Sequence, residues 1–342
     1  MNGQRTGIQT VAGAAGLSTG GTGVGASVGL NIAVERTNAT VGSNARLAAA
    51  GTTTVGADAA LLPLAIDLPD PLPDVVVSNL SISGGISTDG GAGAGSAAVN
   101  IYDLDTIARL DDGVSINAPV LGVVAGAAQD VDVHARSKTQ IEGGAGAGGI
   151  SIGSAGVGIG LDVSIVIEDT QALLGTGVNV RAARDIAIGA ASDHDFTSVA
   201  ATAGVSTDGT GVGGSVSVYV VTNATEAISQ GGAGSALLAG GGLQVTADAP
   251  LNLTQIAGAV AYGNSAGVGI SSTVLVHNDR TQALVGAGTA IAAGSTDGVD
   301  VAATSSENLV TIAVGGGASS SAAVAGSAVV NVLNETTKGR ID

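Results

Sequence analysis

The chain of 342 residues contains no cysteine and no tryptophan, and only one methionine, one phenylalanine and three tyrosines. The absence of cysteine excludes a small fold held by disulfides, and it suits a secreted bacterial chain that stays unfolded during export. A thick globular core is not expected either, because aromatic and large aliphatic side chains dominate such cores. We therefore expect a thin, elongated core filled by Val, Ile, Leu and Ala.

Basic residues are also scarce, with 11 Lys and Arg against 28 Asp and Glu, which gives a formal net charge of −17. An acidic surface without basic patches argues against nucleic acid and anionic membranes as partners. The longest uncharged run, Leu309–Leu333, raises the question of a membrane span. Because it is rich in Ser, Gly and Thr and matches the internal segment 253–276, we interpret it as part of a repeat and predict no membrane insertion.

The chain does contain a repeat. Six threonines each close a β-branched run and open a short segment that usually contains alanine, and we assign them a structural, repeat-defining role: Thr37, Thr106, Thr170, Thr225, Thr281 and Thr336. Successive positions differ by 69, 64, 55, 56 and 55 residues. The chain is therefore a tandem array of units of about 55 residues.

We predict a single repeat array over residues 1–342. Its approximate units are 8–60, 76–135, 137–195, 196–250, 251–308 and a partial unit 309–342. A Pro/Asp-rich inserted loop at 61–75 explains the first long spacing, because it holds four of the six prolines and proline cannot donate to a central ladder. A longer turn at 117–128 explains the second. Because the chain begins and ends inside units, we expect it to be a piece of a longer protein.

Two positions in each unit, seven and five residues before the threonine, are apolar in nearly every copy. They are Leu30, Val99, Val163, Val218, Val274 and Val329, and Ile32, Ile101, Ile165, Val220, Val276 and Asn331. Residues two apart lie on the same face of a strand, so we expect these residues to face a core. A second strand-like stretch after the threonine and a third one that opens each unit make several short strands per unit, separated by glycine-rich links that disfavour helix.

This pattern predicts an all-β fold, a β-solenoid, as a right-handed parallel β-helix with two or three coils per unit. Coils of roughly 18 to 28 residues would give an array about 60 to 90 Å long. Antiparallel pairing of strands across each glycine link would also satisfy the pattern. Silk-like stacking is disfavoured because the Gly-Ala alternation is short, and disorder is disfavoured by a hydrophobic content of 45%.

No catalytic, cofactor-binding or metal-binding motif emerges. We interpret His134, His194 and His277 as solvated or turn residues, because none has a partner at metal-ligand spacing. Ser-Thr-Asp-Gly occurs three times, ending at Gly90, Gly209 and Gly298. Calcium is the one ion that these aspartates could hold, although an aspartate that caps its own turn is the default. We therefore expect no cofactor, with calcium kept as a possibility.

A polysaccharide-active β-helix is the enzymatic alternative, because such enzymes place carboxylates along a solenoid face. The acid pairs to consider are Asp103 with Asp105 and Asp130 with Asp132. Such pairs are more often a solvated strand face than a general acid and base. Since the carboxylates are dispersed and aromatic residues are few, we predict that the chain is not an enzyme.

Segment 211–218, followed by 225–228, and segment 327–337 resemble the repeats of giant bacterial surface proteins, the leukotoxin-type or haemagglutinin-like filamentous adhesins. The resemblance implies an extracellular, surface-anchored β-solenoid stalk that extends and adheres. Its expected partners are neighbouring repeats of a longer parent chain, and cell-surface or matrix receptors or sibling fibres. The alternatives are a purely structural filament or coat segment without a receptor, and the polysaccharide-active enzyme.

Overall fold

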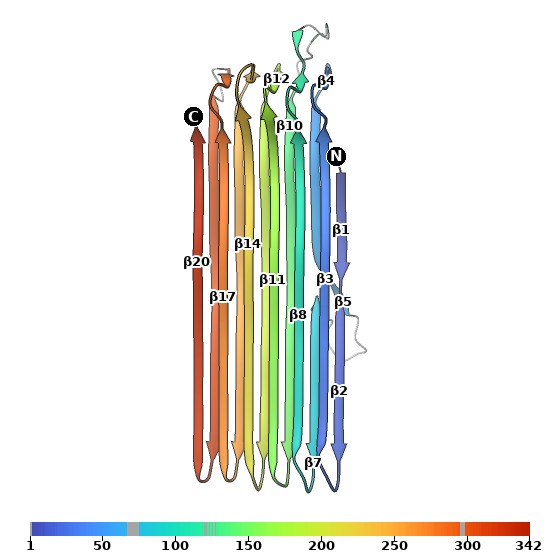
Figure 1. Ribbon diagram of the computed structural model, residues 1–342, viewed down its shortest axis with the longest axis vertical. Coiled ribbons are helices and arrows are strands. Elements are labelled where there is room, and N and C mark those ends of the chain that lie inside the picture. The colour runs from blue at the N-terminus through green and yellow to red at the C-terminus, as the bar shows by residue number, and fades with distance from the viewer. Residues whose placement is uncertain are drawn as a thin grey trace.

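The computed structural model describes residues 2–66, 75–119, 128–294 and 298–342, together with 122, 124 and 126. Throughout these residues the chain is all-β, and long parallel strands stack into sheets (Figure 1). The predicted all-β parallel solenoid is confirmed. None of the described segments forms a helix of the length and apolarity that a membrane crossing needs.

Three sheets run the length of the stack. The strands of sheet A are β1 (Asn2–Ile8), β2 (Thr10–Ser18), β5 (Thr53–Ile66), β6 (Val75–Val77), β7 (Asn79–Ser87), β10 (Val131–Ser151), β13 (Ile186–Ser206), β16 (Leu243–Gly263) and β19 (Val299–Ser319). Sheet B contains β3 (Gly23–Val41), β8 (Ala92–Leu110), β11 (Ala155–Thr176), β14 (Thr210–Gly231), β17 (Ala266–Val285) and β20 (Ala322–Ile341). The short strands of sheet C are β4 (Arg46–Leu47), β9 (Ser115–Ile116), β12 (Asn179–Ala182), β15 (Ala236–Ala239) and β18 (Ala290–Ala292).

Each repeat unit makes one rung of the solenoid. A rung runs along sheet A, turns at the glycine-rich link, returns along sheet B, and reaches the next rung through a short strand of sheet C. Thr170 lies beside Thr225 in sheet B, 55 residues further along the chain. The prediction of two or three coils per unit is therefore wrong.

The molecule is longer along its strands than along its stack (Figure 1). Strands of about 20 residues extend roughly 65 Å, whereas six stacked strands at about 4.8 Å spacing extend only about 24 Å. The predicted array length of 60 to 90 Å is therefore wrong as a stacking distance. All described strand pairs are parallel except β5 with β6, so the alternative of antiparallel pairing across the glycine link is excluded for the repeats.

The long strands join segments that the sequence pattern separated. Strand β16 contains both the stretch at 243–247 and the stretch at 253–257, which were predicted as two elements. The predicted unit boundaries at 195/196, 250/251 and 308/309 consequently fall inside β13, β16 and β19. Alternation continues without a break through these boundaries, and there is no turn to end the strand.

The predicted inserted loop at 61–75 is shorter than its proline content indicated. Residues 61–66 continue β5, and Val75 begins β6, which pairs antiparallel with β5. Pro63 is accommodated because that part of β5 pairs only with β1, through Ile8. Residues 67–74 lie outside the described residues. In the predicted longer turn at 117–128, the described residues contain no strand.

The buried face of sheet B is the opposite of the predicted one. Leu30 and Ile32 are 53% and 60% exposed, whereas Asn31 between them is buried. Their equivalents on the next four rungs also lie on the outer face, and the threonine column lies on the inner face. In the last copy Val329 and Asn331 instead align with the inward-facing Thr273 and Leu275. The expectation that the residues seven and five before the threonine face a core is therefore wrong for five of the six copies.

The interior narrows from the sheet C end toward the glycine-rich turns. At the sheet C end, Val, Ile, Leu and Ala from all three sheets form one apolar cluster. A second cluster in the middle holds the buried aromatic residues Tyr102, Phe196 and Tyr219. Nearer the turns the two long sheets approach each other so closely that a Cβ atom on Gly211 would lie 2.0 Å from the carbonyl oxygen of Tyr262. Only glycine and other small residues fit there, so the bulky β-branched side chains point outward.

Candidate functional site

The repeat-defining threonines form one buried column on the inner face of sheet B. Thr37, Thr106, Thr170, Thr225 and Thr281 are aligned in neighbouring strands and are at most 4% exposed. The sixth does not join them, because Thr336 is aligned with Arg280 and Thr337 with Thr281. The column is architectural: the Thr225 hydroxyl, for example, hydrogen-bonds Ser192 of sheet A across the interior at 2.6 Å.

A buried ion pair lies next to this column. Glu168 on β11 and His194 on β13 are each 1% exposed, and their Oε2 and Nε2 atoms are 3.1 Å apart. The Thr139 hydroxyl donates to Glu168 at 2.7 Å. Burial alone would raise the pKa of Glu168 and lower that of His194, but each partner's charge reverses the effect on the other. Each partner therefore favours the charged form of the other, and the ion pair joins the two long sheets.

A second buried polar layer surrounds Asp162 on β11, whose side chain is fully buried. Burial raises the pKa of Asp162 to about 7, although the Ser198 hydroxyl that donates to it acts in the opposite direction. Nearby, the Asn100 side chain donates to Ser164 at 3.1 Å. Asp162 lies on sheet B and Ser198 on sheet A, so their hydrogen bond joins the two long sheets.

The interpretation of the three histidines as solvated or turn residues is wrong. His134, His194 and His277 lie within strands and are 4%, 1% and 2% exposed. His134 Nδ1 hydrogen-bonds Asp132 at 2.8 Å. His194 pairs with Glu168, as described above. The structure gives His277 no such hydrogen-bond partner, and burial lowers its pKa.

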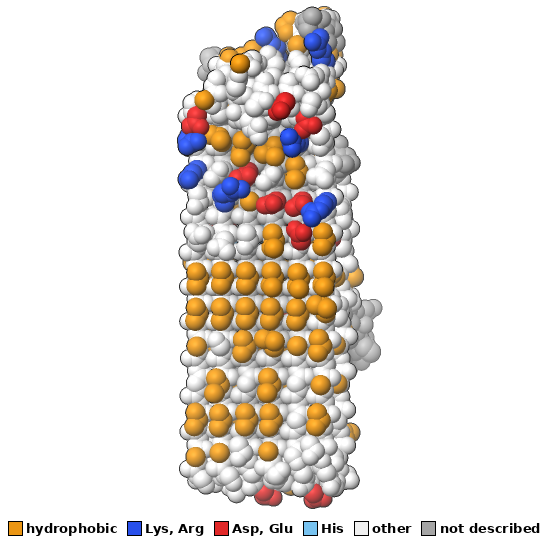
Figure 2. Space-filling model, viewed as in Figure 1, with side chains coloured by type: hydrophobic (Ala, Val, Ile, Leu, Met, Phe, Trp, Pro, Cys, Tyr) orange, Lys and Arg blue, Asp and Glu red, His pale blue; other side chains and the backbone are white. Residues whose placement is uncertain are grey.

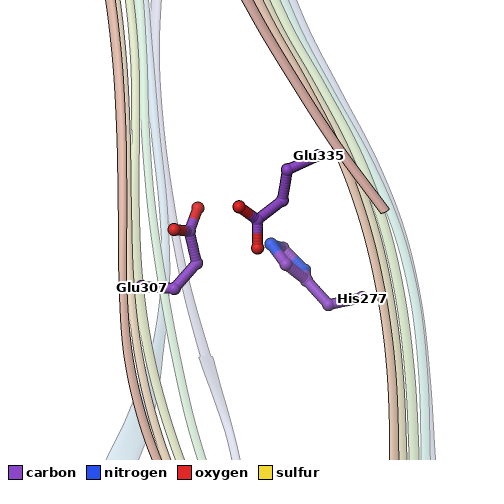
Figure 3. Close-up of side chains that lie close together, drawn as sticks. All are labelled: His277, Glu307 and Glu335. Carbon is purple, nitrogen blue, oxygen red and sulfur yellow. The ribbon is translucent and has the colours of Figure 1, made fainter. Parts of the chain in front are cut away.

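His277 instead forms a group with two carboxylates from other strands. Glu307 lies on β19 and Glu335 on β20, and one potential ligand atom from each of the three side chains lies within 4.8 Å of the others (Figure 3). This is the one group of three or more His, Cys, Asp or Glu side chains found at metal-binding separation among the described residues. Sequence reasoning missed it because the three residues belong to different strands and are at least 28 positions apart.

The first two Ser-Thr-Asp-Gly segments form turns between sheets A and B. In both, the serine caps the turn, because the backbone N–H of Gly90 donates to Ser87 and that of Gly209 donates to Ser206. The default interpretation, in which the aspartate caps its own turn, is therefore wrong for these two copies. Residues 295–297 of the third copy lie outside the described residues.

The acid pairs considered for catalysis bind cations and backbone groups of this chain. Asp103 and Asp105 lie on the outer face of β8, and both form ion pairs with Arg36. Asp130 binds Arg184 at 2.9 Å and Asp132 binds His134. Both pairs take part in structural contacts between neighbouring rungs or along one strand.

The most extensive surface feature is the outer face of sheet B. Two rows of aliphatic side chains cross all six strands without a break, and we call them the apolar face (Figure 2). The rows are Leu30, Val99, Val163, Val218, Val274 and Val330, and Ile32, Ile101, Ile165, Val220, Val276 and Val332. In the last strand the aligned residues are Val330 and Val332, one position after the predicted Val329 and Asn331.

Further aliphatic residues extend the apolar face toward the glycine-rich turns, while charged residues gather toward the sheet C end (Figure 2). The two unbroken rows alone, with six strands at about 4.8 Å spacing and two outward positions at roughly 6.6 Å, make a surface of about 400 Å². This is the size of the largest apolar patch on a typical soluble monomer, and such patches are often interaction surfaces.

Comparison with protein-family models, with curated proteins and with solved structures found no significant match to this chain. The functional assignment therefore rests on the residues and on the geometry described above.

Proposed function

We propose that this chain is a stiff, repetitive segment of an extracellular bacterial filamentous adhesin, and that the apolar face is its contact surface. The single observation that carries the proposal is the in-register stacking of six rungs, which places two unbroken rows of Val, Leu and Ile on the outer face, exposed on the outermost strands and partly exposed between them. A sheet that only needed to remain soluble would carry polar residues on its outer face. The resemblance of the repeats to those of bacterial surface adhesins supports the extracellular setting.

Stiffness follows from how the rungs are joined. Each long strand pairs over about 20 residues with its neighbours, and buried side chains such as Glu168 and His194 link the two sheets. A stack of this kind bends little, because each rung is held by continuous backbone hydrogen bonds as well as by its interior. The purely structural filament without a receptor is the main alternative, and it shares this architecture.

The test places opposite charges on neighbouring strands of the apolar face, in the double variant Val218→Lys, Val274→Glu. These residues are aligned and point outward, so the net charge is unchanged and the strands can still pair. The matched control carries the same charges on the outer face of sheet A, in Thr246→Lys, Ala302→Glu. We expect the wild type and the control to bind apolar beads and cell surfaces, and the face variant to bind at least about tenfold more weakly.

Sedimentation analysis distinguishes the adhesin segment from the purely structural filament. Self-association of the wild-type chain without binding to any surface would favour the structural filament. Equal binding by the face variant and by the control would show that the apolar face is not the contact surface.

A further inference from the structure

The group formed by His277, Glu307 and Glu335 lies between the long sheets at the last two described rungs, where His277 is buried, Glu307 is partly buried and Glu335 is exposed. His277 comes from β17 in the fifth strand of sheet B, Glu335 from β20 beside it, and Glu307 from β19 on the opposite sheet. Figure 3 shows the imidazole and the two carboxylates pointing toward one another across the space between the sheets. Their potential ligand atoms lie within 4.8 Å of one another.

His277 provides an observation that is independent of the acidic residues. It is 2% exposed, and Nδ1 is buried without a hydrogen-bond partner. No ion pair links its ring to any other described residue. Buried polar groups in proteins are nearly always hydrogen-bonded, so an unpartnered imidazole in the interior requires an explanation. His194, which is equally buried, has a carboxylate oxygen of Glu168 3.1 Å from its Nε2, so this fold can place a charged partner beside a buried imidazole.

The charges around His277 are unbalanced. The carboxylates of Glu307 and Glu335 lie beside the imidazole, and Asp279 adds a third acidic group nearby. In the described part of the chain, neither Glu307 nor Glu335 forms an ion pair with Lys or Arg. A bound cation would balance this negative charge.

Asp279 supports the group without being one of its ligands. Its carboxylate accepts hydrogen bonds from Asn223 at 2.7 Å, Thr281 at 2.7 Å and Ser305 at 3.2 Å. The single proton of Ser305 can instead be donated to Glu307, so this hydroxyl lies between the two carboxylates. Asp279 therefore contributes negative charge and, through Ser305, helps to orient Glu307, in the way that outer-shell carboxylates tune metal sites.

The ligand atoms select the class of cation. Imidazole nitrogen suits Zn²⁺ and related transition metals, whereas Ca²⁺ prefers six to eight oxygen ligands. One histidine and two carboxylates fill three positions of a tetrahedral site and leave the fourth for water. Bonds of about 2.0 to 2.2 Å would draw the three side chains closer together, and the exposed Glu335 is free to move.

We propose that His277, Glu307 and Glu335 bind one divalent transition-metal ion, with Zn²⁺ as its representative, and that the ion joins sheet A to sheet B at the last two described rungs. The ion would link the two sheets at these rungs, as the ion pair of Glu168 with His194 links them at the third and fourth rungs. The ion would fix β19 and β20 onto β17, since the three ligands come from these three strands.

Titration of the whole chain with ZnCl₂, followed by calorimetry and by thermal unfolding, tests the proposal. We expect one equivalent to bind and to raise the unfolding temperature. Glu335→Gln is the informative variant, because Glu335 is exposed and its replacement leaves the fold intact. It should weaken Zn²⁺ binding by at least about tenfold. Asp300→Asn is the matched control, since it removes one carboxylate from the exposed face of β19 and should bind like the wild type.

Replacement of Zn²⁺ by Co²⁺ reports the ligands directly. The visible spectrum should be that of tetrahedral Co²⁺ with nitrogen and oxygen ligands, and His277→Gln should abolish it. Absence of Zn²⁺ binding to the wild type, equal affinity of Glu335→Gln and Asp300→Asn, or displacement of Zn²⁺ by equimolar Ca²⁺ would each overturn the proposal.

Discussion

At the scale of single residues, the buried polar side chains set the specificity of the interior. Asn, Ser, Thr, Asp and Glu occupy inward positions that a sequence reading reserves for aliphatic residues. They are tolerated because partners on the opposite sheet or on the next rung satisfy most of them, as the Asn223 amide does by donating to Asp279. A shift of one rung or one residue would leave these groups unpaired, so they favour one register.

Asp162 makes the folding stability of this chain depend on pH. Its folded pKa is raised to about 7 from an ordinary value of 3.8, so the neutral form is favoured in the folded protein. Its contribution to stability is therefore fully present below pH 3.8 and is lost as the pH rises through about 7. The whole shift corresponds to roughly 4 kcal/mol, at 1.36 kcal/mol per unit. Asp162→Asn, which mimics the neutral form, should be more stable than the wild type at pH 8 by a few kcal/mol.

Urea unfolding at several pH values checks this prediction. The stability difference between Asp162→Asn and the wild type should grow from pH 4 to pH 7 and then level off. The exposed Asp300→Asn serves as the control and should follow the wild type throughout. Parallel curves for Asp162→Asn and the wild type would show that folding does not raise the pKa of Asp162.

At the scale of the strand, period-two alternation identified the β segments, but it divided continuous strands such as β16 and assigned the faces of sheet B wrongly. The aliphatic residues of β14 and its neighbours are the more hydrophobic set, and they point outward. The inner face of β14 is instead indicated by its glycines. Gly211 and Gly213 are two residues apart on one face of the strand, and both lie against backbone atoms of β16. Alternate glycines mark the face on which two sheets approach closely.

Two neighbouring valines of β14 test the assignment of faces. Val221 is fully buried in the aromatic cluster, whereas Val220 belongs to the apolar face. Val221→Ala should cost about 2 kcal/mol in the free energy of unfolding, because it removes buried carbon atoms and leaves a cavity. Val220→Ala should cost less than about 1 kcal/mol, since the side chain is only partly covered. Denaturant unfolding of both variants gives the comparison, and equal costs would contradict the inner and outer faces described here.

At the scale of the whole molecule, each rung is a structural unit, and equivalent residues of successive rungs are aligned side by side in the sheets. Removal of residues 155–209 takes out one complete rung, β11 to β13, and leaves Thr210 aligned where Ala155 had been. The deletion removes both Glu168 and His194, so neither member of this ion pair remains buried without its partner. We expect the shortened chain to fold with unchanged strand content and a lower unfolding temperature, because stability in stacked repeats is a sum over units and interfaces.

Circular dichroism and thermal unfolding measure the outcome. Removal of residues 155–182 is the control, because it deletes β11 and β12 but keeps β13 and so interrupts the path between the sheets. That variant should not fold cooperatively. Cooperative folding of the control, or failure of the complete-rung deletion, would contradict one coil per repeat.

The sequence by itself determined that this chain is an all-β array with a period of about 55 residues, because strand alternation and repeat spacing are local properties. Only the tertiary structure decided that neighbouring strands pair in parallel and that one unit makes one coil, since nothing local shows which strands pair or whether an alternating run continues or turns. It also decided which face is buried, because the narrow gap at glycines such as Gly211 excludes Val and Ile. The meeting of His277, Glu307 and Glu335 depends on the stacking register, which brings distant positions together across two sheets.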